Sequence, residues 1–170
     1  MYQYELANPF RRLVRKSGEW PPMSWLYART LHHLDRGVYR ATRGRGTFVS
    51  WVTGLPIVLL TTTGARSGRR RTLPLVAVPN DERLIVIASN YGQPRNPAWY
   101  HNLKANPSAT ATLDGETRVV TARELEGAER DLWYERGVES YPGWVAYRKR
   151  TAPHRRIPVI ELTPTAESSP

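Results

Sequence analysis

The architecture of the chain is decided by residues 56–88, which read PIVLLTTTGARSGRRRTLPLVAVPNDERLIVIA. Apolar and β-branched residues dominate three segments of this stretch, as is typical of strands; the segments are 56–63, 72–78 and 84–88. The connections between them are much shorter than the crossover that parallel neighbours require. The three strands are therefore expected to be antiparallel, which excludes a doubly wound parallel sheet.

The rest of the sequence completes a small α+β domain. Asp114-Gly115, between two β-prone segments, is the strongest hairpin signal in the chain. Asn96-Pro97 predicts the start of a helix, with Asn as the N-cap and Pro in the first helical position. Further strands are expected at 109–113, 117–122 and 157–162, and helices at 96–105, 127–139 and 144–150. About six antiparallel strands with three or four helices favour a small closed or split β-barrel with appended helices.

Composition removes several classes of chemistry. The 170 residues include no cysteine, which excludes thiol nucleophiles, iron–sulfur clusters and disulfides. The four histidines show no metal-ligand spacing, so no metal site is expected. No apolar run reaches the length that spans a membrane, and the N-terminus lacks the apolar core of a signal peptide. A cytoplasmic protein is therefore expected.

The excess of positive charge lies in the first half of the chain. Residues 1–80 contain 13 Lys or Arg against three acidic residues, whereas residues 81–170 contain 12 of each. This asymmetry indicates an anionic partner, either a nucleic acid, a membrane surface or an acidic small molecule. A nucleic acid is not expected, because the basic residues are not interleaved with aromatics in a known recognition pattern.

The first 50 residues form a basic amphipathic helical segment that differs from the rest. Apolar residues recur at helical spacing with arginines between them, at Tyr27, Leu31, Leu34 and Val38. This stripe predicts either an interfacial helix on the inner face of the cell membrane or a helix packed on the barrel. The expected organisation is thus an N-terminal segment, 1–50, a barrel domain, 51–164, and a tail, 165–170.

Residues 61–72, TTTGARSGRRRT, carry the sharpest functional signal. A glycine-containing turn with hydroxyl side chains and four arginines can offer N–H groups, a serine hydroxyl and guanidinium groups to a phosphate. The spacing is not that of a Walker loop. The alternative is an exposed hairpin whose arginines keep the protein in solution.

Two later segments can complete a site. Residues 87–106 lead from a strand through a loop into a helix whose first turn holds Trp99 and Tyr100, and whose N-terminus can bind an anion or a ring carbonyl. Residues 141–147, YPGWVAY, contain three large aromatic side chains that can cover a planar ligand. The alternative for both segments is ordinary packing on the barrel.

These motifs identify a resemblance. The segments LLTTTGARSG (59–68) and NPAWYHNLKANP (96–107), and the spacing of Tyr141, Trp144 and Tyr147, are similar to those of the deazaflavin-dependent nitroreductase family, within it the F420-dependent quinone reductases. The resemblance covers about residues 54–164. It implies a split β-barrel of the flavin-binding type, coenzyme F420 as cofactor and a small-molecule electron acceptor.

The resemblance also implies which residues contact the cofactor. Its anionic phosphate and glutamate tail would meet the turn, and its ring would lie between two later segments. The residues implied are Ala65, Arg66, Ser67, Arg71, Thr72, Leu73, Pro74, Leu75, Val76, Ile87, Ala88, Ser89, Ala98, Trp99, Tyr100 and Asn102, with Arg71 as the main basic contact. Ser89, Tyr141 and Tyr147 are the implied catalytic residues, because they can supply a proton beside the acceptor.

The implied reaction is hydride transfer from the reduced deazaflavin to a quinone-like or nitro-aromatic acceptor. Val76 and Trp144 stand where the family pattern has tyrosines, which removes two hydroxyls from the acceptor side. A quinone, including a membrane quinone, is therefore the expected acceptor. The alternatives are a protein of this fold that binds F420 or flavin mononucleotide without turnover, and a flavin mononucleotide enzyme.

Overall fold

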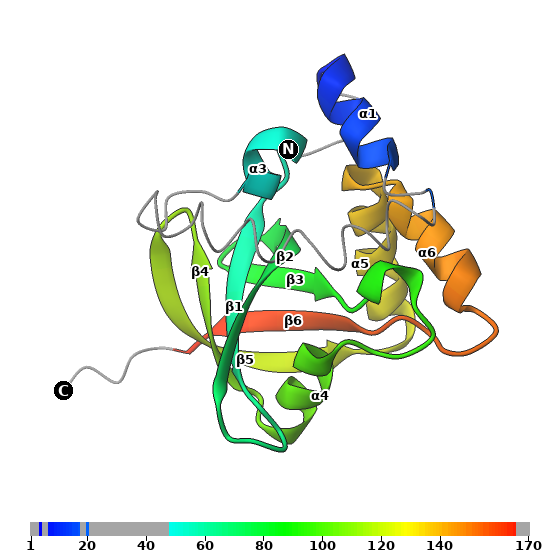
Figure 1. Ribbon diagram of the computed structural model, residues 1–170. Coiled ribbons are helices and arrows are strands. Elements are labelled where there is room, and N and C mark those ends of the chain that lie inside the picture. Colours follow the sequence, from blue (N-terminus) through cyan, green and yellow to red (C-terminus); the bar gives the residue numbers. More distant parts are fainter. Residues whose placement is uncertain (1–3, 5–6, 18–19, 21–47, 166–170) are drawn as a thin grey trace.

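The computed structural model describes residues 4, 7–17, 20 and 48–165 of the chain. Six antiparallel strands close into a barrel in the order β1-β2-β3-β6-β5-β4 (Figure 1). The strands are β1 (Ile57–Thr63), β2 (Arg70–Asn80), β3 (Arg83–Ile87), β4 (Ser108–Leu113), β5 (Glu116–Leu125) and β6 (Val159–Pro164). The antiparallel barrel expected from the sequence is confirmed.

The barrel interior is the first of two apolar cores. Every second residue of a strand faces inward, so that Val58 and Leu60 of β1 are fully buried among interior side chains of the other strands. Helix α4 (Ala98–Ala105) adds Trp99 and Leu103 to this core, each about 4% exposed. Burial of these two side chains fixes α4 to the barrel. α4 also contacts the turn between β1 and β2 through Asn102.

The second core lies outside the barrel, where helices α5 (Gly127–Ser140) and α6 (Gly143–Thr151) pack against β2, β3 and β6. Contact is close at Gly137, because a Cβ there would lie 2.5 Å from Ile87 Cδ1 and 2.6 Å from Trp144 Cζ3. Glycine is therefore required at this crossing. β1 is apolar on both faces because both faces are covered: Ile57 and Leu59, which alternate with the interior residues, are also buried.

The N-terminal helix α1 (Pro9–Ser17) is joined to the barrel domain by a buried arginine. Arg15 is 3% exposed and donates hydrogen bonds to the carbonyls of Thr53, in helix α3 (Phe48–Thr53), and of Ser140, at 2.9 and 3.0 Å. The stripe at residues 27–38 lies outside the described residues. None of the helices that the structure describes is long and apolar enough to cross a bilayer.

Several element boundaries differ from the expected ones, and three of the differences have a clear physical reason. Helix α4 begins at Ala98 with Pro97 as its N-cap, because the Asn96 side chain is not a cap but accepts a hydrogen bond from Arg155 at 2.6 Å. β2 extends to residues 70–80, since its first residues pair with the end of β1. Ile157 is buried but precedes β6, which begins at residue 159.

Candidate functional site

The turn between β1 and β2 closes on itself. The Gly64 N–H donates to the Arg69 carbonyl at 2.9 Å, and the Gly68 N–H donates to the Gly64 carbonyl at 2.8 Å. Gly68 has φ +63°, a conformation that favours glycine. A Cβ at Gly64 would lie 2.7 Å from Ser67 Oγ. The two glycines thus let the chain turn tightly around the serine.

Asn102 of α4 braces this turn from below. Its side-chain oxygen accepts a hydrogen bond from the Ala65 N–H, and its amide donates to Thr62 Oγ1, each at 3.0 Å. Asn102 is 9% exposed and Thr62 is 1% exposed, so the bond between them is buried, whereas the bond to exposed Ala65 is only partly buried. The sequence suggested Asn102 as a cofactor contact; in the structure it fixes the position of the turn that carries the arginines.

The turn leaves several hydrogen-bond donors unused. Among the described residues, the guanidinium groups of Arg66, Arg69 and Arg71 make no hydrogen bond or ion pair, whereas Arg70 donates to Thr110 Oγ1 at 3.1 Å. The backbone N–H groups of Arg66 and Ser67 are also unpaired within this part of the chain. Three exposed cations, two amides and a serine hydroxyl match the needs of a phosphate or carboxylate ligand.

Strand β2 divides the other expected contacts between two faces. Leu73 and Leu75 pack against the barrel interior, as do Ala88 and Tyr100, and Val76 packs against the outer core. This division follows from the alternation of side chains along a strand. Leu73 and Leu75 therefore lie on one face of β2 and Val76 lies on the other.

An aromatic cluster occupies the outer core beside Val76 and Ile87. The hydroxyls of Tyr141 and Tyr147 lie 3.0 Å apart, and Tyr91 meets the Tyr147 ring edge-on at a centroid distance of 6.4 Å. Tyr147 is only 2% exposed and Tyr141 is half-buried. The structure thus joins Tyr141 and Tyr147, two of the expected catalytic residues, in one hydrogen-bonded pair.

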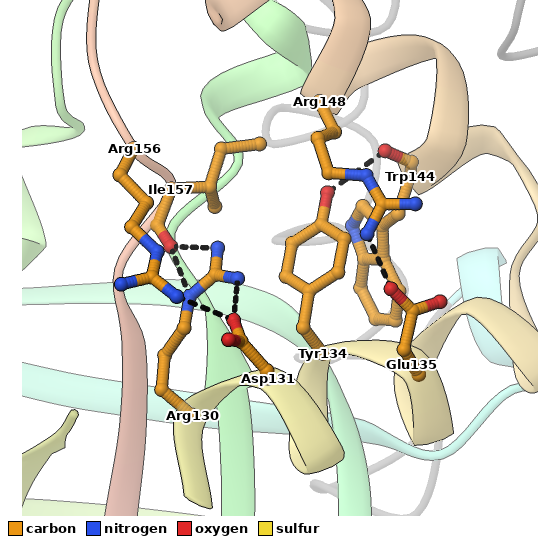
Figure 2. A network of polar contacts seen from close by, with 8 residues as sticks. All are labelled: Arg130, Asp131, Tyr134, Glu135, Trp144, Arg148, Arg156 and Ile157. Atoms are coloured by element: carbon orange, nitrogen blue, oxygen red, sulfur yellow. Dashed lines mark hydrogen bonds and ion pairs between the residues drawn. The ribbon is translucent and has the colours of Figure 1, made fainter. Parts of the chain in front are cut away.

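The helices behind this cluster are held by a polar network (Figure 2). Tyr134 of α5 is fully buried and donates to the Trp144 carbonyl of α6 at 2.8 Å, and burial raises the pKa of its hydroxyl to about 12. The guanidinium carbons of Arg130 and Arg148 lie 4.5 and 5.1 Å from the centre of its ring. Arg148 is also paired with Glu135. The network fixes the first turn of α6 and hence the position of Trp144.

Arg130 extends the network to the chain that leads into β6. It donates two hydrogen bonds to the Ile157 carbonyl, at 2.6 and 3.2 Å (Figure 2). Asp131 accepts from Arg130 at 2.8 Å and from Arg156 at 2.5 Å, and these two cations lower the pKa of its carboxyl. Arg130 and Arg156 are thus both paired with the carboxylate of Asp131.

The three expected segments, 61–72, 87–106 and 141–147, contact one another in series: the first meets the second, and the second meets the third. Asn102 connects the turn to α4, and the loop before α4 contacts the aromatic cluster through Tyr91. The hydroxyl of Ser89, in this loop, makes no hydrogen bond to the described residues. Ala98, at the start of α4, is exposed. No group of three or more His, Asp or Glu side chains suited to a metal occurs among the described residues.

Sequence reasoning missed three residues that shape the site. Tyr91 lies within residues 87–106, but it was not among the expected site residues. Arg69, which has no partner among the described residues, lies on the turn beside the expected Arg66 and Arg71. Arg155 donates to several groups of the loop before α4. The four clustered arginines were a visible signal for Arg69. No signal existed for Arg155, because most of its acceptors are backbone carbonyls.

Comparisons with known proteins bear on this site. The model of a family described as F420H(2)-dependent quinone reductase matches residues 33–164. An F420H(2)-dependent quinone reductase of Mycobacterium tuberculosis is 35% identical over 137 residues, which cover 78% of this chain and 89% of the relative. The resemblance to F420-dependent quinone reductases is confirmed by these matches.

Solved structures agree with the sequence relatives. An F420-H2 dependent reductase is 44% identical and superimposes with a TM-score of 0.58, over 63% of this chain and 93% of the other. A second chain, described as a domain-swapped dimer, is 37% identical with a TM-score of 0.61, over 83% of this chain and 98% of the other. The barrel with its appended helices is thus shared with a reductase that uses reduced F420.

Proposed function

The chain belongs to the F420H(2)-dependent quinone reductase family and is an F420-dependent oxidoreductase; from this premise we propose that it reduces a quinone-like acceptor with reduced F420 as the electron donor. The observation that carries the proposal is the set of unpaired donors on the turn between β1 and β2. An apolar, aromatic acceptor side supports the choice of a quinone.

The turn suits the anionic part of the cofactor. Arg66, Arg69 and Arg71 can form charge-assisted hydrogen bonds with its phosphate and glutamate carboxylates. The N–H groups of Arg66 and Ser67, which have no acceptor among the residues that the structure describes, add two neutral donors. Because Asn102 already fixes the turn, little further ordering is needed when the anion binds. These residues fit the cofactor, and we infer that they hold it.

The acceptor side consists of residues in the outer core. Bound reduced F420 supplies a hydride from its deazaflavin ring, and the protein orients the acceptor and provides a proton. Tyr141 and Tyr147 share a hydrogen bond through which a proton can pass to an acceptor oxygen, and Ser89 offers a second hydroxyl. Val76, which carries no hydroxyl and is partly exposed, leaves an apolar surface on which a quinone ring can stack, and Trp144 is buried in the same core.

Titration of the purified protein with F420 and with flavin mononucleotide tests the cofactor assignment. The fluorescence of each ligand is followed separately as protein is added. We expect saturable binding of F420 that weakens as salt is raised, since charged contacts at an exposed turn are screened. Binding of flavin mononucleotide alone would support the flavin enzyme instead. F420 binding without turnover of any acceptor would support the non-catalytic alternative.

We also propose that the N-terminal segment makes peripheral contact with a membrane, which would be the source of a membrane quinone. In α1, Phe10 and Leu13 are more than 60% exposed beside Arg11, Arg12 and Lys16, an arrangement suited to an anionic lipid surface. Vesicles with and without phosphatidylglycerol test this contact by co-sedimentation. A variant with Phe10→Ser and Leu13→Ser should lose binding, whereas equal sedimentation of both proteins would refute the contact.

A further inference from the structure

The loop between β3 and α4 has an unfavourable backbone. Three consecutive residues have positive φ angles: Asn90 at 48°, Tyr91 at 55° and Gly92 at 77°. Left-handed backbone is sterically unfavourable for a side chain such as that of Tyr91, whereas asparagine and glycine adopt it more readily. Strain of this kind persists only where surrounding contacts over-determine the conformation, and it is concentrated at functional sites. Something must therefore hold this loop in place.

Asn90 Nδ2 donates to the Arg95 carbonyl at 2.9 Å within the loop, and Arg155, in the segment after α6, holds the loop from outside. One terminal nitrogen donates to the Ala88 carbonyl at 3.1 Å and to Asn96 Oδ1 at 2.6 Å. The other terminal nitrogen donates to the Ser89 carbonyl at 2.9 Å, and Nε donates to the Gln93 carbonyl at 3.2 Å. One guanidinium group thus connects the beginning, the middle and the end of the loop.

The partners of Arg155 distinguish it from its neighbours. Arg130, Arg148 and Arg156 each form an ion pair with a carboxylate, whereas Arg155 has no carboxylate partner among the described residues. Burial of this charge lowers its pKa. A partly buried cation that serves only neutral acceptors gains no ion pair, and its contacts are specific to the shape of one loop.

The shape of this loop determines how two parts of the proposed site are arranged. On one side it carries Ser89, and on the other it packs on α6, where a Cβ at Gly92 would lie 3.2 Å from Tyr147 Cα. The Tyr91 ring contacts the Tyr147 ring from this loop. Movement of the loop would therefore change the position of the Ser89 hydroxyl relative to the tyrosine pair.

We propose that Arg155 is a positioning residue of the reductase: its guanidinium group holds the loop at residues 88–96 in its strained conformation and so places Ser89 and Tyr91 beside the acceptor. This role rests on the proposed function. Among the described residues, Arg155 contacts this loop and makes no hydrogen bond or ion pair with the turn that is proposed to hold the cofactor's anionic groups, so those charged contacts remain when Arg155 is replaced. Its loss should therefore lower turnover more than it weakens F420 binding.

The test compares Arg155→Ala with Arg156→Ala, its neighbour, which is paired with exposed Asp131. With menadione as acceptor, we expect kcat of Arg155→Ala to fall about tenfold or more, since small misplacements of reacting groups cost up to about a hundredfold. The Kd for F420 should change little. Free guanidinium, at concentrations that do not unfold the protein, should restore part of kcat in Arg155→Ala, and Arg156→Ala should resemble the wild type.

A second readout does not depend on activity. Hydrogen–deuterium exchange of the ligand-free protein should become faster in residues 88–97 of Arg155→Ala, while exchange in the turn at residues 64–69 stays as in the wild type. If Arg155→Ala does not fold, Arg155→Lys takes its place. This variant retains the charge but not the planar fork, so it should show the same local change in exchange. Unchanged exchange in the loop, or a kcat close to the wild type, would overturn the proposal. A wild type without quinone reductase activity would instead refute the proposed function, and the exchange result would still decide the role of Arg155.

Discussion

Replacement of Asn102 by alanine should weaken F420 binding, because Asn102 fixes the turn that carries the arginines. The change removes the side-chain oxygen that accepts from the Ala65 N–H and the amide that donates to Thr62 Oγ1. The turn then loses its link to α4. We expect the arginines of the turn to remain present but to sample more conformations, so that binding must pay the cost of ordering them.

The structure allows the size of the effect to be worked out. Thr62 is fully buried, so loss of its partner costs about 1–3 kcal/mol of stability, and loss of the bond to exposed Ala65 costs about 1 kcal/mol. Asn102→Ala should therefore lower the free energy of unfolding by about 2–4 kcal/mol. If the bond to Ala65 is what orders the turn, F420 affinity should fall about fivefold to tenfold, the equivalent of about 1 kcal/mol.

Thr62→Val is the matched control for this prediction. It removes the hydroxyl that Asn102 contacts but leaves the Ala65 bond in place. Denaturant unfolding and fluorescence titration with F420 are measured for both variants and the wild type. Both variants should be less stable, and only Asn102→Ala should bind F420 more weakly. Equal affinity in all three proteins, or equal weakening in both variants, would refute the role of Asn102 in ordering the turn.

Three further predictions concern single side chains. Arg71→Ala should weaken F420 binding by about 1–3 kcal/mol in the same titration, whereas Arg136→Ala, exposed on α5, should not. Burial raises the pKa of Tyr134 to about 12, against about 10 in the unfolded chain, so its hydroxyl contributes stability that is present below pH 10 and is lost as the pH rises through 12; between pH 10 and pH 12 the free energy of unfolding should fall by about 2 kcal/mol less in Tyr134→Phe than in the wild type. Val76→Tyr should raise the rate of nitroimidazole reduction relative to menadione in steady-state assays, and an unchanged ratio would remove Val76 from the acceptor side.

Local signals were sufficient to predict most of the barrel. The short connections in residues 56–88 require antiparallel neighbours, and the register of β1 with β2 agrees with that requirement. Asp114 and Gly115 both have positive φ, at 52° and 88°, as the two-residue hairpin predicted from them requires. These features depend on residues close in sequence, so the sequence shows them directly.

Barrel closure and the supports of the site depend on partners distant in sequence. β6 pairs with β3 on one side and with β5 on the other, and no pattern within residues 157–162 specifies those neighbours. Asn102 and Arg155 were beyond prediction as supports for a similar reason. The first acts on a turn 37 residues away, and the second acts on backbone carbonyls more than 60 residues away.

The sequence predicted the position of the arginine turn, but it did not predict which face of β2 each side chain occupies. The arginine turn was recognisable because its donors exceed what a hairpin needs, and the guanidinium groups of Arg66 and Arg71, which have no partner in the described part of the chain, support that interpretation. The division of β2 between two faces follows from strand geometry, but its phase was not assigned from the sequence. Assigning that phase would have separated Leu73 and Leu75 from Val76 in advance. Which of these residues contact the cofactor stays a prediction.

Anaerobic turnover of reduced F420 with menadione is the direct test of whether the protein reduces a quinone with F420 as the electron donor. Purified protein, reduced F420 and menadione are mixed, and the appearance of oxidised F420 is followed by its absorbance beside a reaction without protein. We predict protein-dependent oxidation of one F420 for each menadione reduced, with little oxidation when a nitroimidazole replaces the quinone. Oxidation no faster than in the reaction without protein, although F420 binds, would contradict it.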